Sequence, residues 1–140
     1  MAANTARLSM QYTGAVALLH GTVGLFDFSS ESLQDKHTAE LASRVTVLDN
    51  GTADPNALQP QQITIKLTSG EKMSASITEV YGSPANPMDE TAHLAKVRHC
   101  CEFAGLSAET TTALIENGLE LDRRLDIGRW LCNAWRSDIR

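Results

Sequence analysis

The sequence has no cluster of positive charge and no long apolar run. Lysine and arginine number 12 against 17 aspartates and glutamates, so the formal net charge is −5. Nucleic acids and anionic bilayers bind basic patches, and this balance argues against either as the main partner. No stretch approaches the ~18 apolar residues of a membrane span, and the first ten residues hold no signal-peptide core. We therefore expect a cytoplasmic protein that binds neither nucleic acid nor membrane.

Cysteine is scarce and odd in number, with two of the three residues adjacent: Cys100, Cys101 and Cys132. This pattern does not predict a disulfide framework, and a reducing compartment suits it better. A chain of 140 residues fits one domain and can bury enough surface to fold without disulfides or metals.

Recognisable cofactor motifs are also lacking. There is no P-loop, no GxGxxG, no HExxH and no GxSxG in the sequence, so we expect no cofactor and no metal. Asp89, His93 and Cys100 share one helical face and could hold a metal, but nothing nearby completes a ligand set, which favours ordinary helix residues.

Two further groups of reactive residues have similar plain interpretations. Cys100 and Cys101 could be a thiol pair, but they lie late in their predicted helix, where the helix dipole opposes a thiolate. Glu116, Glu120 and Asp122 are more typical of a solvated helix face than of catalytic carboxylates.

Helical periodicity is present near the N-terminus. Apolar residues recur at helical spacing in a stripe: Leu8, Tyr12, Ala15, Val16 and Leu19. Ser9 is suited to cap the start of this helix, and Gly21 to end it. Similar signals predict helices over 36–44, 89–104 and 107–117 and a helical tail over 119–135.

Strand patterns occupy the middle of the chain. Apolar and polar residues alternate on both sides of a Gly-containing turn at 68–71, which predicts a β-hairpin over 61–80 with one wet face. The β-branched run 45–48 predicts another strand. The expected fold is an α+β two-layer sandwich: a small, mostly antiparallel sheet, helices on one face, and a helical C-terminal tail.

Tyr12 is the most interesting single residue of the first helix. A phenol can donate a hydrogen bond to a substrate carboxylate or enolate. Its place on the apolar stripe equally suits a core tyrosine whose hydroxyl is satisfied within the protein.

Two segments give the chain a resemblance to a known family. Residues 6–12 (Ala-Arg-Leu-Ser-Met-Gln-Tyr) precede an apolar helix and His-Gly, and residues 81–88 (Tyr-Gly-Ser-Pro-Ala-Asn-Pro-Met) precede another helix. With the Arg-Val-Thr-Val run at 44–47 between them, their order and spacing resemble the C-terminal portion of the MmgE/PrpD family. The resemblance extends from about residue 5 to 135.

The resemblance implies a function and a site. Members include 2-methylcitrate dehydratase, cis-aconitate decarboxylase and iminodisuccinate epimerase, which are cofactor-independent enzymes acting on small di- and tricarboxylates. They have a large helical domain and a smaller α+β lid, and most acid, base and carboxylate-binding residues come from the large domain. The lid contributes a tyrosine to the cleft, and that residue matches Tyr12 here.

The sequence also departs from the family pattern. The helical domain has no counterpart in these residues, an aromatic usual in the helix after the proline loop is Val97, and Tyr81 lacks the usual following proline. Proton abstraction from carbon needs a positioned base, which a single phenol does not supply. We therefore expect a lid-type domain over 1–118 and a helical tail over 119–140 that packs on it or on a partner. Alone it is expected to be inactive, and a separate helical-domain chain is one expected partner.

The alternative is a self-associating interaction domain without enzymatic activity, since faces that the helical domain would cover favour association. The tail with Trp130 and Trp135 is the expected contact surface. We predict a homodimer at micromolar concentration, to be measured by light scattering. A strictly monomeric mass would contradict this expectation.

Overall fold

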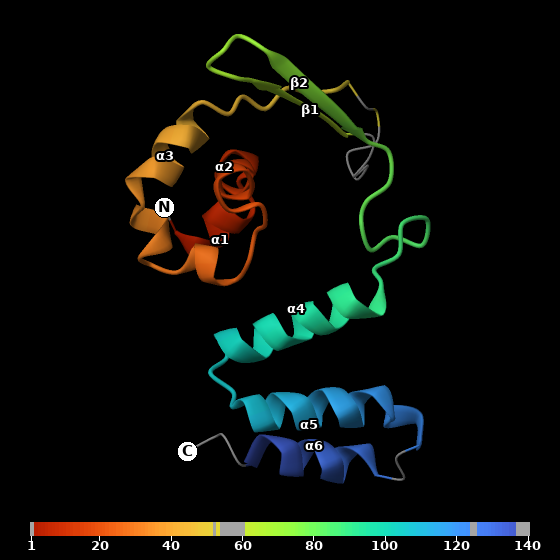
Figure 1. Ribbon diagram of the computed structural model, residues 1–140. Coiled ribbons are helices and arrows are strands. Elements are labelled where there is room, and N and C mark those ends of the chain that lie inside the picture. The colour runs from red at the N-terminus through yellow and green to blue at the C-terminus, as the bar shows by residue number, and fades with distance from the viewer. Residues whose placement is uncertain (1, 52, 54–60, 124–125, 137–140) are drawn as a thin grey trace. The chain divides into compact units, whose positions relative to one another are not determined.

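The structure is a computed structural model that describes residues 2–51, 53, 61–123 and 126–136, with only the backbone of 131 and 133–136. The chain divides into two compact units, one of residues 1–46 with 91–140 and one of residues 47–90. Helices and a two-stranded antiparallel sheet make up the described part, so the predicted α+β class is confirmed (Figure 1). No helix in the described ranges is long and apolar enough to cross a bilayer.

The first unit begins with a short helix, α1 (Ala3–Arg7), that sequence patterns did not predict, and continues into α2 (Met10–His20). The predicted ends of α2 are confirmed. The Ser9 side chain accepts a hydrogen bond from the Tyr12 N–H, and Gly21 follows the helix at φ 76°, a conformation that favours glycine.

After α2 the chain makes two 3₁₀ turns, η1 (Phe26–Phe28) and η2 (Ser32–Gln34), and enters α3 (Lys36–Ser43). Asp35 caps α3 by accepting hydrogen bonds from the N–H and the hydroxyl of Thr38, at 2.7 and 2.8 Å. These bonds, the backbone one first, lower the pKa of Asp35. Helices α2 and α3 lie side by side (Figure 1).

The first unit continues with α4 (Glu90–Phe103), α5 (Ala108–Leu119), the 3₁₀ turn η3 (Leu121–Arg123) and α6 (Ile127–Arg136). Ser107 caps α5 as predicted, because its hydroxyl accepts from the Thr110 N–H at 3.1 Å. The helical tail is confirmed in α6, which lies beside α5 (Figure 1). The side chain of Trp135, part of the predicted contact surface, lies outside the described residues. The predicted division at residue 118 stays a prediction.

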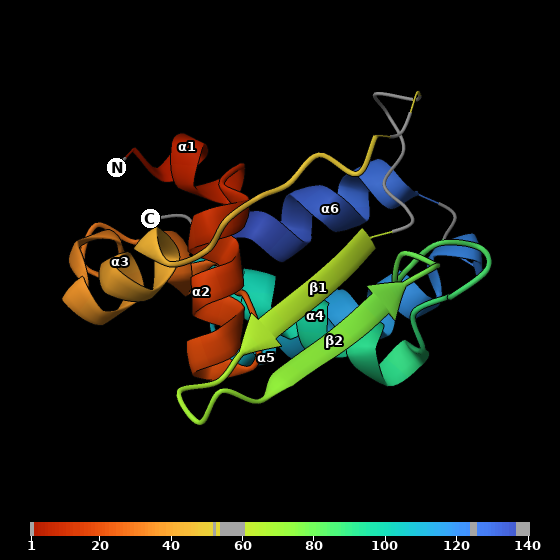
Figure 2. The same ribbon diagram turned by 90° about the horizontal axis from the view of Figure 1, so that it is seen from above.

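The second unit contains the hairpin, formed by β1 (Gln61–Lys66) and β2 (Lys72–Ile77), which run antiparallel (Figure 2). The hairpin is therefore shorter than the predicted 61–80. In the register, Ile63 faces Ala75 and Ile65 faces Met73, while Thr64 faces Ser74 and bonds its hydroxyl at 3.0 Å. The predicted separation into an apolar and a polar face is confirmed.

The predicted strand over 45–48 is wrong. The sheet has only the two hairpin strands in the part of the chain that the structure describes. The Val45 N–H instead donates to the Ala42 carbonyl and extends the end of α3. A β-branched run fits a strand locally, but it needs a neighbouring strand to bond to, and no strand among the described residues pairs with this run. Whether helices cover the apolar face of the hairpin stays a prediction.

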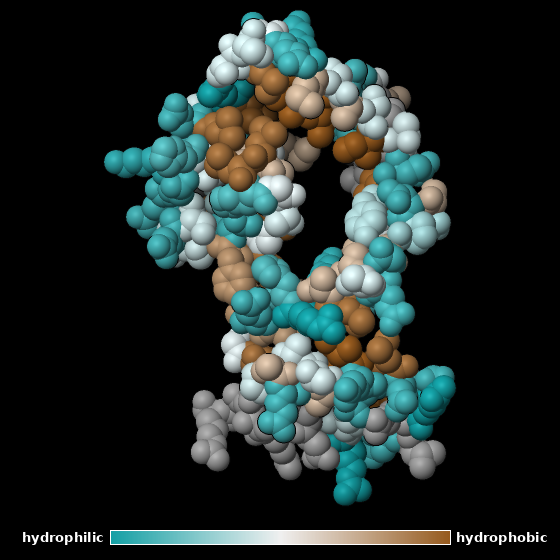
Figure 3. Space-filling view, in the orientation of Figure 1, coloured by the Kyte–Doolittle hydropathy of each residue, from teal (hydrophilic) through white to brown (hydrophobic). Residues whose placement is uncertain are grey.

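The core of the first unit is small. Its buried cluster comprises Ala6, Tyr12 and Val16, against which Phe28 and Leu33 pack. The ends of the predicted α2 stripe are not buried, since Leu8 is 86% exposed and Leu19 also lies at the surface. Figure 3 shows apolar surface around α2 and α3 and along α4 and α5.

Candidate functional site

Tyr12 lies in the first turn of α2 and is buried, with 5% of its surface exposed. Its ring packs against Phe28, with ring centroids 6.0 Å apart and planes tilted by 48°. The Arg7 guanidinium covers the Phe28 ring at 5.5 Å, a cation–π contact beside the core. The phenol ring is thus fixed by packing.

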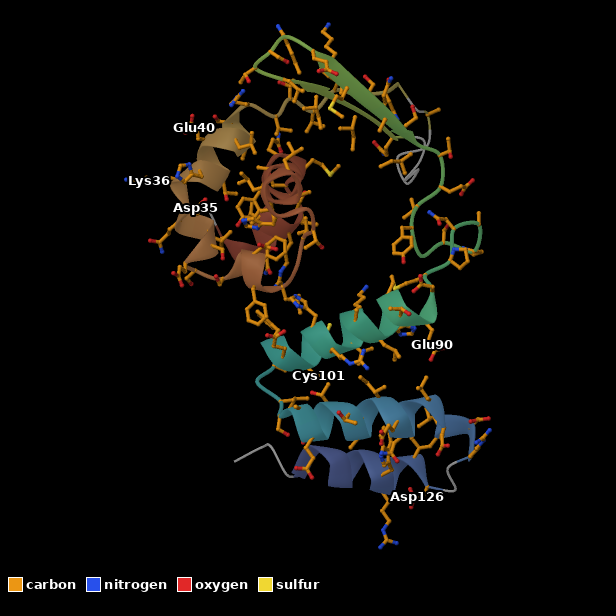
Figure 4. The ribbon with its side chains drawn as sticks, in the orientation of Figure 1. Asp35, Lys36, Glu40, Glu90, Cys101 and Asp126 are labelled. Carbon is orange, nitrogen blue, oxygen red and sulfur yellow. The ribbon has the colours of Figure 1, made fainter. Side chains whose placement is uncertain are left out.

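The Tyr12 hydroxyl has one defined partner. It donates to the main-chain carbonyl of Asp27 at 2.5 Å. Burial, followed by the negative charges of Asp27 and Asp35, raises the pKa of this phenol above its usual 10.0. Figure 4 shows Asp35 at the first turn of α3. At neutral pH the group is therefore an uncharged hydrogen-bond donor.

The loop that supplies this carbonyl, residues 21–28, is held by the side chain of Asp27. One carboxylate oxygen accepts from the Gly24 N–H at 2.7 Å. The other lies 3.2 Å from Nδ1 of His20, at the last residue of α2. Because a carboxylate only accepts, this contact requires the His20 proton on Nδ1. Asp27 therefore binds the loop and the end of α2 at once.

The same loop is joined to α4 through His99. The Leu25 N–H donates to Nε2 of His99 at 3.0 Å, which makes Nε2 an acceptor and His99 neutral in this arrangement. Phe26 packs edge-on against His99 and against Phe103, at centroid distances of 5.4 and 5.2 Å. Gly24 sits so close that a β-carbon there would lie 2.7 Å from His99 Nε2. A β-carbon at 24 would therefore push the His99 imidazole away from the Leu25 N–H.

The other candidate residues are not brought into a site. Among the described residues, no group of three or more His, Cys, Asp or Glu side chains is placed to hold a metal. Asp89, His93 and Cys100 are described residues and form no such group. Cys101 is buried near the end of α4, consistent with packing (Figure 4), while Cys100 and Cys132 are exposed free thiols.

The three carboxylates at 116, 120 and 122 lie at the surface, as the solvated-face interpretation predicts. Glu120 lies 3.6 Å from Arg123 in an exposed pair. Exposed pairs of this kind contribute little to stability.

Sequence patterns drew attention to Tyr12 as a candidate, but not to the residues that contact it. Asp27 and His99 carry no motif, and the Leu25–His99 bond joins residues 74 positions apart. One local signal was available: Asp27 follows Gly24 by three residues, a spacing at which an aspartate side chain can accept from a loop N–H. Nothing in the sequence connects this loop to residue 99.

The helices and the hairpin define a small α+β domain in which one buried phenol is held by a structured loop. A family model described as the MmgE/PrpD C-terminal domain matches residues 2–121. The chain therefore belongs to the MmgE/PrpD family, and the resemblance noted in the sequence is confirmed. A search of curated proteins found no match. The helix α6 lies beyond the matched range.

Replacing Gly24 with alanine is expected to destabilise the first unit by about 1 kcal/mol, the contribution of one hydrogen bond. The new methyl group would displace His99 and break its bond from the Leu25 N–H. The measurement is urea unfolding followed by circular dichroism. Gly14→Ala is the matched control: a β-carbon there meets nothing within 4 Å, and alanine favours a helix, so this variant should gain ~0.5–1 kcal/mol. Equal effects from both variants would contradict the close contact.

Replacing Tyr12 with phenylalanine is expected to cost about 1 kcal/mol at pH 7, because the Asp27 carbonyl loses its donor. The folded pKa of Tyr12 is raised, so this phenol stabilises the fold fully below the unfolded pKa near ~10 and less as pH rises beyond it. The stability difference between wild type and Tyr12→Phe should therefore narrow in urea titrations above about pH 10. A constant difference up to pH 11 would show that the phenol is not protected from ionisation.

Proposed function

We propose that this domain is the small lid of an MmgE/PrpD-type lyase or isomerase acting on small di- or tricarboxylates, and that it works together with a helical domain. The observation that carries the proposal is the family match over residues 2–121. The family's chemistry removes or moves a proton at carbon beside a carboxylate, which requires a positioned base. In this proposal the base comes from the helical domain, and the lid contributes Tyr12.

The chemical state of Tyr12 supports this role. Its phenol is uncharged at neutral pH and rigidly packed, as a hydrogen-bond donor to a developing enolate or carboxylate needs to be. To reach a substrate, the hydroxyl must exchange the Asp27 carbonyl for a substrate oxygen. Such an exchange replaces one hydrogen bond by another, so its net cost is about 1 kcal/mol or less.

Exposed apolar side chains support a covering domain. Near the end of α2 and the following loop, Leu18, Leu19, Val23 and Phe26 are exposed, and the apolar hairpin residues Ile63, Met73 and Ile77 are exposed too. Apolar patches exposed on a protein surface mark sites of interaction with other proteins. A helical catalytic domain is the occupant that the family chemistry requires.

The same exposed residues favour, as a second candidate, a domain that associates with its own copies and has no catalytic role. The two candidates differ in what covers the surface. Only the first requires a base from another domain and a reaction on a carboxylate substrate.

Mixing the chain with an MmgE/PrpD helical domain should give activity on small polycarboxylates, measured as loss of water, release of carbon dioxide or epimerisation. Tyr12→Phe should lower kcat by about 10²-fold or more, the range that one transition-state hydrogen-bond donor supplies. Tyr81→Phe is the matched control, since Tyr81 is an exposed tyrosine outside the buried cluster. An active mixture that Tyr12→Phe leaves unchanged would rule out the role of Tyr12.

A further inference from the structure

We propose that Asp27 is the positioning residue for Tyr12: its carboxylate locks the 21–28 loop so that its own main-chain carbonyl meets the phenol. This inference rests on the proposed role of Tyr12 and adds the element that holds the phenol in place before it exchanges the carbonyl for a substrate oxygen. Asp27 contributes two different groups: its carboxylate bonds His20 and the Gly24 N–H, and its main-chain carbonyl accepts from the Tyr12 hydroxyl.

The first step of the argument is the placement of Asp27 against α2. Tyr12 is in the first turn of this helix and His20 is its last residue, so they lie about 12 Å apart along the axis. Asp27 contacts both, the phenol through its carbonyl and the imidazole through its carboxylate. A loop bonded at both ends of a helix cannot slide along it without losing one contact.

The second step is the closure of the loop on itself. The carboxylate oxygen that does not meet His20 accepts from the Gly24 N–H at 2.7 Å, three residues back. This bond fixes the turn between 24 and 27 and with it the direction of the Asp27 carbonyl.

The third step is the attachment of the loop to α4. Between Gly24 and Asp27, the Leu25 N–H donates to His99 and the Phe26 ring contacts His99. The loop is therefore bonded to α4 as well as to α2. With the Asp27 carboxylate bonded to Gly24, the main-chain carbonyl of Asp27 is held in one position.

Asp27 could instead affect Tyr12 through its charge alone, since its negative charge is one reason why the pKa of the phenol is raised. The two explanations differ in what a substitution must preserve. Positioning depends on an acceptor oxygen at the right distance from the Gly24 N–H. A charge effect depends only on the negative charge.

Nitration of tyrosine by tetranitromethane, mapped by peptide mass spectrometry, separates these explanations in the chain itself. The chain has two tyrosines, and Tyr81 is 55% exposed, so its rate is an internal reference for the buried Tyr12. Asp27→Asn removes the charge and keeps an oxygen for Gly24. Asp27→Glu keeps the charge but moves the oxygens one methylene away.

Positioning predicts that Asp27→Asn leaves Tyr12 protected, whereas Asp27→Glu and Asp27→Ala raise its nitration rate about tenfold relative to Tyr81, the factor that one hydrogen bond is worth. Asp35→Asn is the matched control: it removes the other charge acting on the phenol and keeps a good helix cap, so it should raise the Tyr12 rate far less than Asp27→Ala does. The opposite order, with Asp27→Asn exposing Tyr12 and Asp27→Glu protecting it, would overturn the inference.

Circular dichroism at the same pH shows whether a variant has unfolded. If Asp27→Glu and Asp27→Ala both unfold, Asp27→Asn still separates the two explanations: protection of Tyr12 excludes the charge effect, and exposure of Tyr12 overturns positioning. The readout does not depend on catalysis. A nitration pattern other than the expected one would therefore contradict the positioning role of Asp27. An active mixture that Tyr12→Phe leaves unchanged would contradict the proposed role of Tyr12, which is a separate result.

Discussion

The hydrogen bond from the Tyr12 hydroxyl to the Asp27 carbonyl connects the parts of the first unit that come before and after the end of α2. Tyr12 is the largest of the buried apolar residues that the structure describes, and the others are alanines, a valine and a cysteine. With so little buried apolar area, directional contacts carry more of the arrangement than they would in a large core. Tyr12 supplies both apolar burial and a directional contact, because its ring packs on Phe28 while its hydroxyl bonds the loop.

Features that depend on neighbours in sequence could be predicted. The caps at Ser9 and Ser107 and the helix end at Gly21 depend on local backbone bonding, so the residue types at these positions predict them. The two faces of the hairpin follow from alternation and a Gly turn. The prediction of a strand over 45–48 was wrong because a strand forms only where a neighbouring strand pairs with it, and the local sequence pattern holds no information about that neighbour.

The site shows the same division. Tyr12 stands in a recognisable motif, whereas its acceptor is a main-chain carbonyl, a group that every residue carries and that no residue type signals. The bond to His99 arises only when α4 packs against the loop, and neither residue type nor spacing encodes that approach. Periodicity also overstated the buried stripe of α2: Leu8 and Leu19 fit it in sequence but lie at the surface. An apolar residue at helical spacing indicates a face that suits contact, and the contact can be made by another domain.

The hairpin has a consequence for handling the protein. Within the described residues each of its two strands pairs only with the other, so both are edge strands. Edge strands are templates on which strands of other chains can add in concentrated solution, and Ile63, Met73 and Ile77 of this hairpin are exposed. Lys66 and Lys72 face each other at the turn end, where their like charges oppose such stacking. The polar face, with its facing Thr64 and Ser74, adds no charge farther along the strands, so precipitation on storage would start from the end of the hairpin away from the turn.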